Sequence, residues 1–223
     1  MFAHYPSTSK MSLGDLKRLV NTGEGTFLEF KRTISSPEKI AREVCAFANT
    51  KGGTLLIGVN DDKTLSGVMS FYEESYLLAE ALEILCDPPV EHTTEIVELG
   101  DKEIVVVKVE EAEHKPVFVK LGKKRIAFVR KKDQSVRASK ERVALLKTES
   151  KEEGISFQYG HNEQQLFRYL NEYGKITVPE YSKLISLNKY KSARILVSLV
   201  SLGVLHLFEE NEVEYFTLSN EAF

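Results

Sequence analysis

The sequence has 223 residues, enough for one large domain or two ordinary ones, and its 42% hydrophobic and 28% charged residues are typical of a globular protein. No apolar run approaches the roughly 20 residues that a membrane-spanning helix needs. Residues 1–11 also lack the apolar stretch of a signal peptide. We therefore expect a cytoplasmic protein with no membrane partner.

Helix caps, glycines and hydrophobic periodicity divide the first two thirds of the chain into helices and strands. Ser12 and Ser36 each precede an apolar pattern of helical period and are typical N-terminal caps. The mixture of helices and hairpins favours an α+β fold over regular βαβ alternation. Helices are predicted over 13–20, from 37 to the glycines at 52 and 53, over 73–85 and over 139–147, and strands over 27–31, 54–59, 93–99, 103–109, 116–121 and 125–130.

The last third of the chain predicts a second, smaller domain. A polar stretch with two glycines at 151–160 looks like a linker, so we expect a first domain at 1–150 and a second at 161–223. Three predicted helices are followed by a predicted hairpin, which is the order of a winged helix-turn-helix. The helices are predicted over 163–173, 178–185 and 189–202, and the strands over 204–209 and 214–218.

The two cysteines, Cys45 and Cys86, both lie in apolar segments. Neither belongs to a CxxC pair or has a histidine at a ligand spacing, which gives a zinc site little support. We therefore expect two small buried hydrophobic residues rather than a disulfide or a pair of metal ligands.

Three stretches resemble the Schlafen AlbA-type domain. These are EGTFLEFKRT at 24–33, REVCAFANTKGGTLLIGVNDD at 42–62 and SGV at 66–68. A fourth stretch, KPVFVKLGKKRIAFVRKKDQSVRAS at 115–139, looks like the closing hairpin and helix of that family. The resemblance covers roughly residues 12–148 and implies an α+β fold in which helices accompany a mixed sheet.

The resemblance also implies a function. Bacterial members are described as nucleic-acid-binding regulators, often with a C-terminal winged helix. By this likeness the chain is a DNA- or RNA-binding protein that regulates transcription, forms homo-oligomers, needs no cofactor and is not an enzyme.

The alternative function is a metal-dependent endonuclease acting on RNA, because some eukaryotic Schlafens are similar in this core and have that activity. Their acidic site includes an E-x4-E pair just before an F-K dipeptide. Glu24 and Glu29, followed by Phe30-Lys31, match that pair. The third acidic residue of the family lies near the end of the following strand, where the aspartates at 61 and 62 are the nearest candidates. The resemblance thus implies Mg²⁺ or Mn²⁺ held by Glu24, Glu29 and Asp61.

Strand geometry gives Glu29 and Lys31 a possible shared role. Side chains two residues apart on a strand project to the same side, so these two would lie together. The carboxylate could hold a divalent cation, and the lysine could orient water or stabilise the charge of a phosphoryl transition state. The favoured interpretation of the same pair is an exposed ion pair that contributes little to stability.

A glycine-containing turn separates the second predicted helix from the strand that follows. Its backbone N–H groups could cradle a phosphate, which makes Asn49, Thr50, Lys51, Gly52 and Gly53 a candidate phosphate loop. The loop follows a helix and lacks the G-x4-G-K-[ST] spacing of a nucleotide-binding loop. A tight turn that lets the strand pack closely is therefore the favoured interpretation.

Positive charge gathers in one segment, although the formal net charge is −3. Residues 114–151 contain 13 Lys or Arg and three Asp or Glu. Such a surplus is typical of a surface that attracts a polyphosphate, and a solvated face that aids solubility is the alternative. The predicted nucleic-acid contacts in this segment are Lys120, Lys123, Lys124, Arg125, Arg130, Lys131 and Lys132.

The predicted winged helix contains charges of both signs. Lys189, Lys191 and Arg194 lie at the start of its third helix, where they suit phosphate and base-edge contacts. Its hairpin carries four acids, at 209, 210, 212 and 214, which would repel phosphate. We expect the helix rather than the wing to contact DNA. A third function remains open, in which the acidic wing and the basic hairpin pair between protomers as an interaction module.

Overall fold

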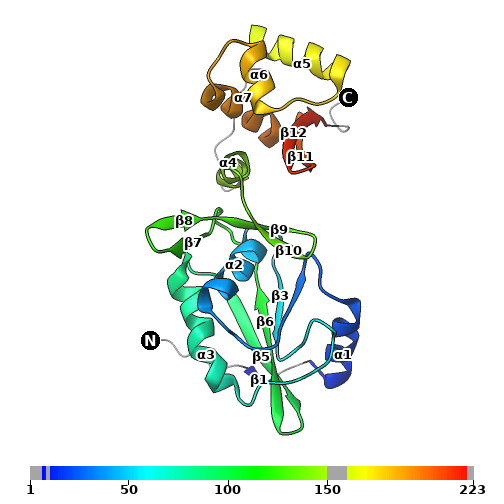
Figure 1. Cartoon of the computed structure of the whole chain (residues 1–223), viewed down its shortest axis with the longest axis vertical. Coiled ribbons are helices and arrows are strands. Elements are labelled where there is room, and N and C mark those ends of the chain that lie inside the picture. The colour runs from blue at the N-terminus through cyan, green and yellow to red at the C-terminus, as the bar shows by residue number, and fades with distance from the viewer. Residues whose placement is uncertain (1–6, 9–10, 150–159, 220–223) are drawn as a thin grey trace. The chain divides into compact units, whose positions relative to one another are not determined.

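A computed structural model describes residues 7–8, 11–149 and 160–219 (Figure 1). The chain divides into two compact units, Met1–Ala138 and Ser139–Phe223. The first unit is a mixed α+β structure, as predicted, and the second contains helices and one hairpin. Within the described residues, the helices are all too short or too polar to cross a bilayer.

A five-stranded mixed sheet forms the centre of the first unit, in the order β1-β5-β6-β3-β2. β5, β6 and β3 pair in antiparallel fashion, whereas β2 pairs with β3 in parallel and is joined to it by helix α2 (Pro37–Ala48). The rest of the sheet consists of the β5–β6 hairpin and the short strand β1, which pairs with β5 in parallel. The strands are β1 (Ser7–Thr8), β2 (Leu28–Lys31), β3 (Gly53–Ile57), β5 (His92–Leu99) and β6 (Lys102–Val109).

Helices cover both faces of the sheet. Leu16 and Val20 of α1 (Leu13–Thr22) pack on one face, against Leu56 and Val106. Helix α2 packs on the other face, together with α3 (Phe71–Ala79) and the helix η1 (Glu80–Leu85) that continues it. The strand interiors are buried on both sides because α2 and α1 exclude water from opposite faces.

The predicted helix over 73–85 differs in kind from what the sequence indicated. It begins at Phe71, after the cap Ser70, and its second half is a π-helix. A π-helix places one more residue in each turn than an α-helix does. Hydrophobic periodicity assumes a uniform α-helical turn, so it cannot predict this change.

The segment after β6 forms a second layer of short strands. β7 (Phe118–Leu121) pairs with β4 (Cys86–Asp87) and with β8 (Lys124–Ile126), and β9 (Phe128–Lys131) pairs with β10 (Gln134–Arg137). The predicted strand over 125–130 is therefore wrong as one element. It breaks at the buried Ala127, whose carbonyl accepts a hydrogen bond from the N–H of Ala138. A run of strand-forming residues does not show where the pairing partner changes.

The second unit begins earlier than predicted. Helix α4 (Lys140–Glu149) packs against α7 (Lys189–Ser201), and Leu145 of α4 belongs to the second hydrophobic core. The division after Ala138 therefore differs from the predicted boundary at residue 150. Apart from Gly160, the predicted linker over 151–160 lies outside the described residues.

The rest of the second unit contains three helices followed by a hairpin, in the predicted order. They are α5 (His161–Tyr173), α6 (Val178–Leu184), α7, β11 (Leu205–Glu210) and β12 (Val213–Leu218). Ile176, between α5 and α6, adds an isolated bridge to Phe216 of β12. Whether this unit is a winged helix-turn-helix stays a prediction.

Both cysteines are buried free thiols, as predicted. Burial raises the pKa of Cys45 to about 12 and also raises the pKa of Cys86. Since the thiolate is the nucleophile, neither residue should react at neutral pH. We expect a thiol-reactive dye to label no cysteine in the folded protein and both in denaturant. If one cysteine of the folded protein were labelled as fast as in denaturant, the core around α2 would have to open.

Candidate functional site

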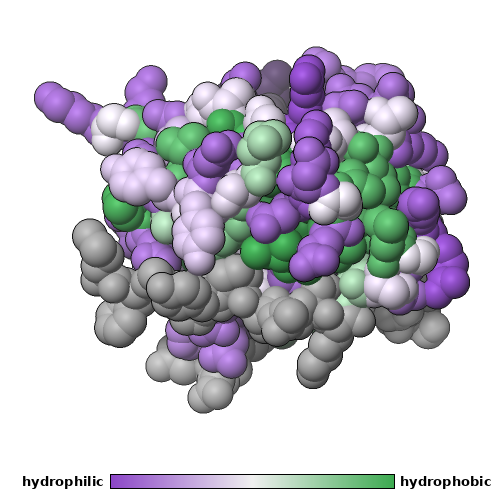
Figure 2. All heavy atoms as spheres, turned by 90° about the horizontal axis from the view of Figure 1, so that it is seen from below, coloured by the Kyte–Doolittle hydropathy of each residue, from purple (hydrophilic) through white to green (hydrophobic). Residues whose placement is uncertain are grey.

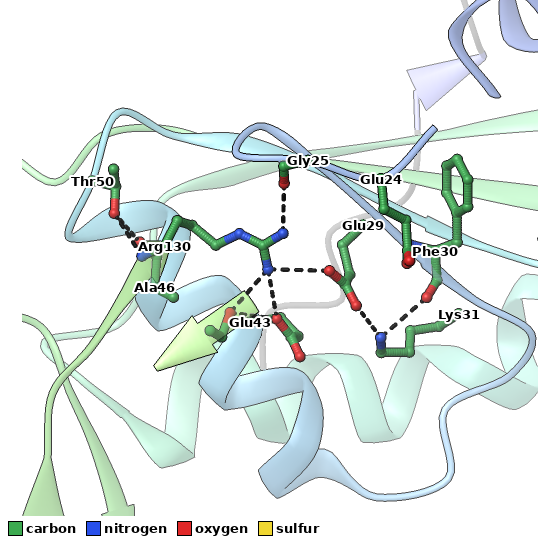
Figure 3. A network of polar contacts seen from close by, with 10 residues as sticks. Glu24, Gly25, Glu29, Phe30, Lys31, Glu43, Ala46, Thr50 and Arg130 are labelled. Atoms are coloured by element: carbon green, nitrogen blue, oxygen red, sulfur yellow. Dashed lines mark hydrogen bonds and ion pairs between the residues drawn. The ribbon is translucent and has the colours of Figure 1, made fainter. Parts of the chain in front are cut away.

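Arg130 of β9 lies at the centre of a buried polar network (Figure 3). Its side chain is 0% exposed. The Nη1 atom donates to Oε2 of Glu29 at 3.1 Å and to Oε2 of Glu43 at 2.9 Å, and Nη2 donates to the carbonyl oxygen of Gly25 at 2.6 Å. The network therefore joins β9 to the edge strand β2, to helix α2 and to the loop before β2.

Further contacts surround this guanidinium, although its Nε atom is buried without a hydrogen-bond partner. Ser135 of β10 accepts a hydrogen bond from Nη1 of Arg130 at 3.0 Å and itself donates to Glu43. The guanidinium also lies over the Phe47 ring, 4.7 Å from the ring centroid. A cation in the interior requires partners of this kind, because removal from water costs several kcal/mol for each unpaired ion.

The prediction that Arg130 contacts nucleic acid is wrong. Its charge is buried and satisfied by two carboxylates, so it cannot reach a phosphate at the surface. Sequence reasoning counted it with its lysine neighbours because a charge run does not show which of its members the fold turns inward. Glu43 and Ser135, which hold it, were not predicted, and no spacing in the sequence marked them.

Glu24 and Lys31 close the outer edge of the sheet. β2 is the last strand, so part of its backbone has no neighbouring strand. The Glu24 carboxylate accepts the N–H of Phe30 at 2.9 Å, and the Lys31 ammonium donates to the Phe30 carbonyl at 3.1 Å and to Glu29. These side chains occupy positions that a further strand would use, which is one way in which proteins protect a sheet edge from pairing.

The three predicted carboxylate ligands of a metal lie in one region but do not form a metal site. Partial desolvation raises the pKa of Glu24, the charges on Glu29 and Asp61 raise it further, and Lys31 lowers it, so all four groups lie within electrostatic reach. Yet among the described residues no three His, Cys, Asp or Glu side chains are gathered closely enough to hold a metal ion. The Glu29 carboxylate is already shared between Lys31 and Arg130.

Side chains of the predicted phosphate loop form hydrogen bonds with other segments of the first unit. Asn49 is buried, and its side-chain amide donates to the carbonyls of Val117 and Phe128 at 2.8 and 2.9 Å while its oxygen accepts the N–H of Val117 at 2.7 Å. The end of α2 is thereby tied to the strands that follow β6. Thr50 accepts the backbone N–H of Arg130 through its hydroxyl at 3.0 Å.

The backbone of the same loop confirms that it is a tight turn. The N–H groups of Thr50 and Gly52 both donate to the carbonyl of Phe47, so they do not point toward a ligand. A Cβ on Gly52 would lie 2.6 Å from the carbonyl oxygen of Val109, and one on Gly53 would lie 2.3 Å from the Phe47 ring. The two glycines allow β3 to pack closely, and Lys51 is exposed beside them.

The remaining predicted contacts in the first unit are exposed. Lys123 lies in the turn between β7 and β8, and Lys132 in the turn between β9 and β10. Arg125 is exposed but forms an ion pair with Asp87 at 2.7 Å and lies 4.7 Å from the centroid of the Phe118 ring. The exposed bases of the two hairpins are Lys120, Lys123, Lys124, Arg125, Lys131, Lys132 and Arg137.

In the second unit, Lys189, Lys191 and Arg194 are exposed along the first turns of α7. Tyr190 lies between the two lysines and is 73% exposed. In the wing, Glu210 pairs with Lys175. Glu214 accepts a hydrogen bond from Ser139 at 2.9 Å.

We predict that Arg130→Ala destabilises the first unit by about 3–5 kcal/mol, because it leaves Glu29 and Glu43 buried without their counterion. Urea denaturation followed by circular dichroism measures the change. Arg137→Ala, which removes an exposed arginine from the neighbouring strand, is the matched control and should change stability by less than about 0.5 kcal/mol. Equal effects of the two substitutions would contradict the assignment of Arg130 as the central buried cation.

The sequence of the first unit matches a known protein family. Residues 24–139, more than half of the chain, match the family described as Schlafen, AlbA_2. Among solved structures, the N-terminal domain of a RecG-related protein from Nitrosomonas europaea is similar over 68% of this chain and 99% of its own, with 22% identity and a TM-score of 0.43.

A second solved structure, the DIP2311 protein from Corynebacterium diphtheriae, is similar over 87% of this chain at 14% identity and a TM-score of 0.44. This chain covers 34% of that protein's length. The family match contains the stretches EGTFLEFK and FANTKGG, which supply Glu29 to the buried network and Asn49 to the tie between α2 and the later strands. The chain belongs to the Schlafen AlbA_2 family.

Proposed function

We propose that this protein binds nucleic acid through the two basic turns of its first unit. The observation that carries the proposal is the exposure of Lys123 and Lys124 at one turn and of Lys131 and Lys132 at the other. Membership of the Schlafen AlbA_2 family supports the same class of partner. Phosphate contacts of this kind contribute affinity without sequence preference.

The spacing of the two turns fits a duplex. β8 and β9 follow one another almost directly, so the turns lie at opposite ends of an extended segment (Figure 1). At about 3.3 Å per residue, the distance from Lys124 to Lys132 is at most roughly 26 Å. One turn of B-DNA rises about 34 Å, so both turns can contact phosphates within a single turn of the same duplex.

Sequence recognition is assigned to α7 in this proposal, and with it a role in regulating transcription. Lys189, Tyr190, Lys191 and Arg194 present donors and an aromatic ring at the N-terminal end of the helix, where recognition helices contact base edges. The acids of the β11–β12 hairpin disfavour its insertion along the phosphate backbone, so α7 would act without the wing.

The nuclease alternative is not supported by a specific observation in the described residues. Glu24 binds the edge of β2, and Glu29 is neutralised by two cations, so neither carboxylate is left to hold a divalent ion as arranged. Homo-oligomer formation remains part of the proposal.

We predict that Lys123→Ala combined with Lys124→Ala lowers the salt dependence of binding. Each lost phosphate contact should reduce the slope of log affinity against log salt concentration by about 1, so the double variant should lose about 2. Fluorescence anisotropy with labelled duplex DNA, single-stranded DNA and duplex RNA measures the slope and identifies the preferred strand type.

The matched control for that experiment is Lys17→Ala combined with Lys39→Ala, which removes the same charge from exposed positions in other helices. Its slope should equal that of the unchanged protein. An equal reduction of the slope in both double variants would show that binding depends on overall charge. An unchanged slope in both would contradict the proposal.

We predict that Lys189→Glu combined with Lys191→Glu abolishes preference for a selected DNA sequence while leaving part of the nonspecific affinity. Glutamates at the start of α7 repel the phosphates that border the DNA groove, whereas the basic turns are unchanged. Sequence selection from a random duplex library compares this variant with Lys183→Glu, an exposed lysine on α6. Unaltered preference in the α7 variant would show that this helix is not the reader.

A further inference from the structure

The first unit contains an acidic segment as distinct as its basic one. From residue 64 to residue 101 the sequence has nine Asp or Glu and no Lys or Arg. This segment supplies α3, η1, β4 and β5. On α3 and η1, Glu73 and Glu83 are exposed and Glu80 is partly exposed.

Large apolar and aromatic side chains lie uncovered on the same helix. Tyr72 and Tyr76 of α3 are 72% and 75% exposed, and Ile84 of η1 is 62% exposed. Leu78, Ala81 and Leu82 face the core instead. Figure 2 shows that hydrophobic side chains lie open among hydrophilic ones on one face of the molecule. An exposed stripe of this kind, formed by Tyr72, Tyr76 and Ile84, is typical of an interaction surface.

The π-helix contributes to this stripe. Continuing α3 with α-helical turns would rotate Ile84 away from Tyr76, because Ile84 follows Tyr76 by eight residues, about 2.2 turns, which leaves it about 80° from the same side. The wider turn of η1 instead keeps Ile84 exposed while Leu82 remains buried. Single π-helical turns occur frequently at functional sites.

The acidic helix is connected to the basic β7–β8 hairpin through the short strand β4. η1 leads into β4, which pairs with β7, and β7 pairs with β8. Asp87 of β4 forms an ion pair with Arg125 of β8. Figure 1 shows α3 and the β7–β8 hairpin along the same edge of the unit. The exposed acids and tyrosines belong to α3 and η1, and the exposed Lys120, Lys123 and Lys124 belong to the hairpin.

We propose that this bipolar surface is the interface of a symmetric homodimer. The surface comprises the exposed residues of α3 and η1 and the lysines of the β7–β8 hairpin. A surface that is acidic at one end and basic at the other is complementary to itself after a two-fold rotation. The helix of each protomer then contacts the hairpin of its partner, and the apolar residues between them become buried.

Charge complementarity favours a second copy over other occupants. The acids on α3 and η1 repel nucleic acid, whereas the same chain supplies an equally exposed basic hairpin. Specific interfaces bury about 1,200–2,000 Å² in total. Two tyrosines from each protomer would account for roughly 600 Å² of that, at about 150 Å² for each ring.

The test uses the full chain, freed of nucleic acid, in sedimentation-velocity ultracentrifugation. The unchanged protein should sediment as a dimer at low salt and dissociate as salt rises, because the pairing is partly electrostatic. A monomer at all protein concentrations and salt conditions would overturn the proposal. Assemblies that grow beyond the dimer would overturn the two-fold symmetry, since only a heterologous contact continues without closing.

Charge reversal makes the test specific. One variant combines Glu80→Lys with Glu83→Lys, and the other combines Lys123→Glu with Lys124→Glu. Each alone should be monomeric, because both contacts of its homodimer become repulsive. An equal mixture of the two should sediment as a heterodimer, because both contacts become attractive again. Failure of the mixture to associate, although circular dichroism shows both variants folded, would overturn the interface.

Two further variants separate this inference from the proposed nucleic-acid function. Glu98→Lys combined with Asp101→Lys makes the same charge change near the β5–β6 turn and should leave the dimer intact. Tyr72→Ser combined with Tyr76→Ser lies outside the basic turns and should raise the dimer dissociation constant at least tenfold while retaining nucleic-acid binding. Loss of nucleic-acid binding with the dimer intact would count against the proposed function alone, and an unchanged dissociation constant would count against the interface alone.

Discussion

A single buried cation constrains the first unit more than any other group. The guanidinium of Arg130 is removed from water, so the fold must supply Glu29, Glu43 and the Gly25 carbonyl together or leave a charge uncompensated in the interior. Those partners belong to the edge strand, the long helix and the loop between α1 and β2. The position of the β9–β10 hairpin follows from this requirement, and so does the position of the exposed lysine at its turn.

The residues that first suggested chemistry therefore have internal partners. Glu29 neutralises Arg130, Glu24 and Lys31 satisfy the edge of β2, and Asn49 ties α2 to the later strands. The side chains that are exposed and can contact other molecules are the lysines at two turns and the acids and tyrosines of one helix. If both proposals hold, nucleic acid and a second protomer compete for the β7–β8 hairpin, so dimer formation would limit nucleic-acid binding.

Elements with strong local signals were predicted correctly. Ser12 and Ser36 cap the helices that they were expected to cap, and the turn after Leu99 separates two strands that pair along their whole length. Prediction failed where a long-range partner decides the outcome. The strand over 125–130 divides because its halves pair with different strands, and η1 departs from the α-helical turn that periodicity assumes.

By itself, the sequence determined most of the helices and of the longer strands, that both cysteines are buried, and which family the chain resembles. These properties depend on residues close together along the chain. The tertiary structure alone decided which charges are buried, because desolvation depends on segments far apart: Arg130 and Glu29 are separated by 101 positions. It also decided that α4 packs with the second unit, since Leu145 is apolar in either domain and only its neighbours in space assign it.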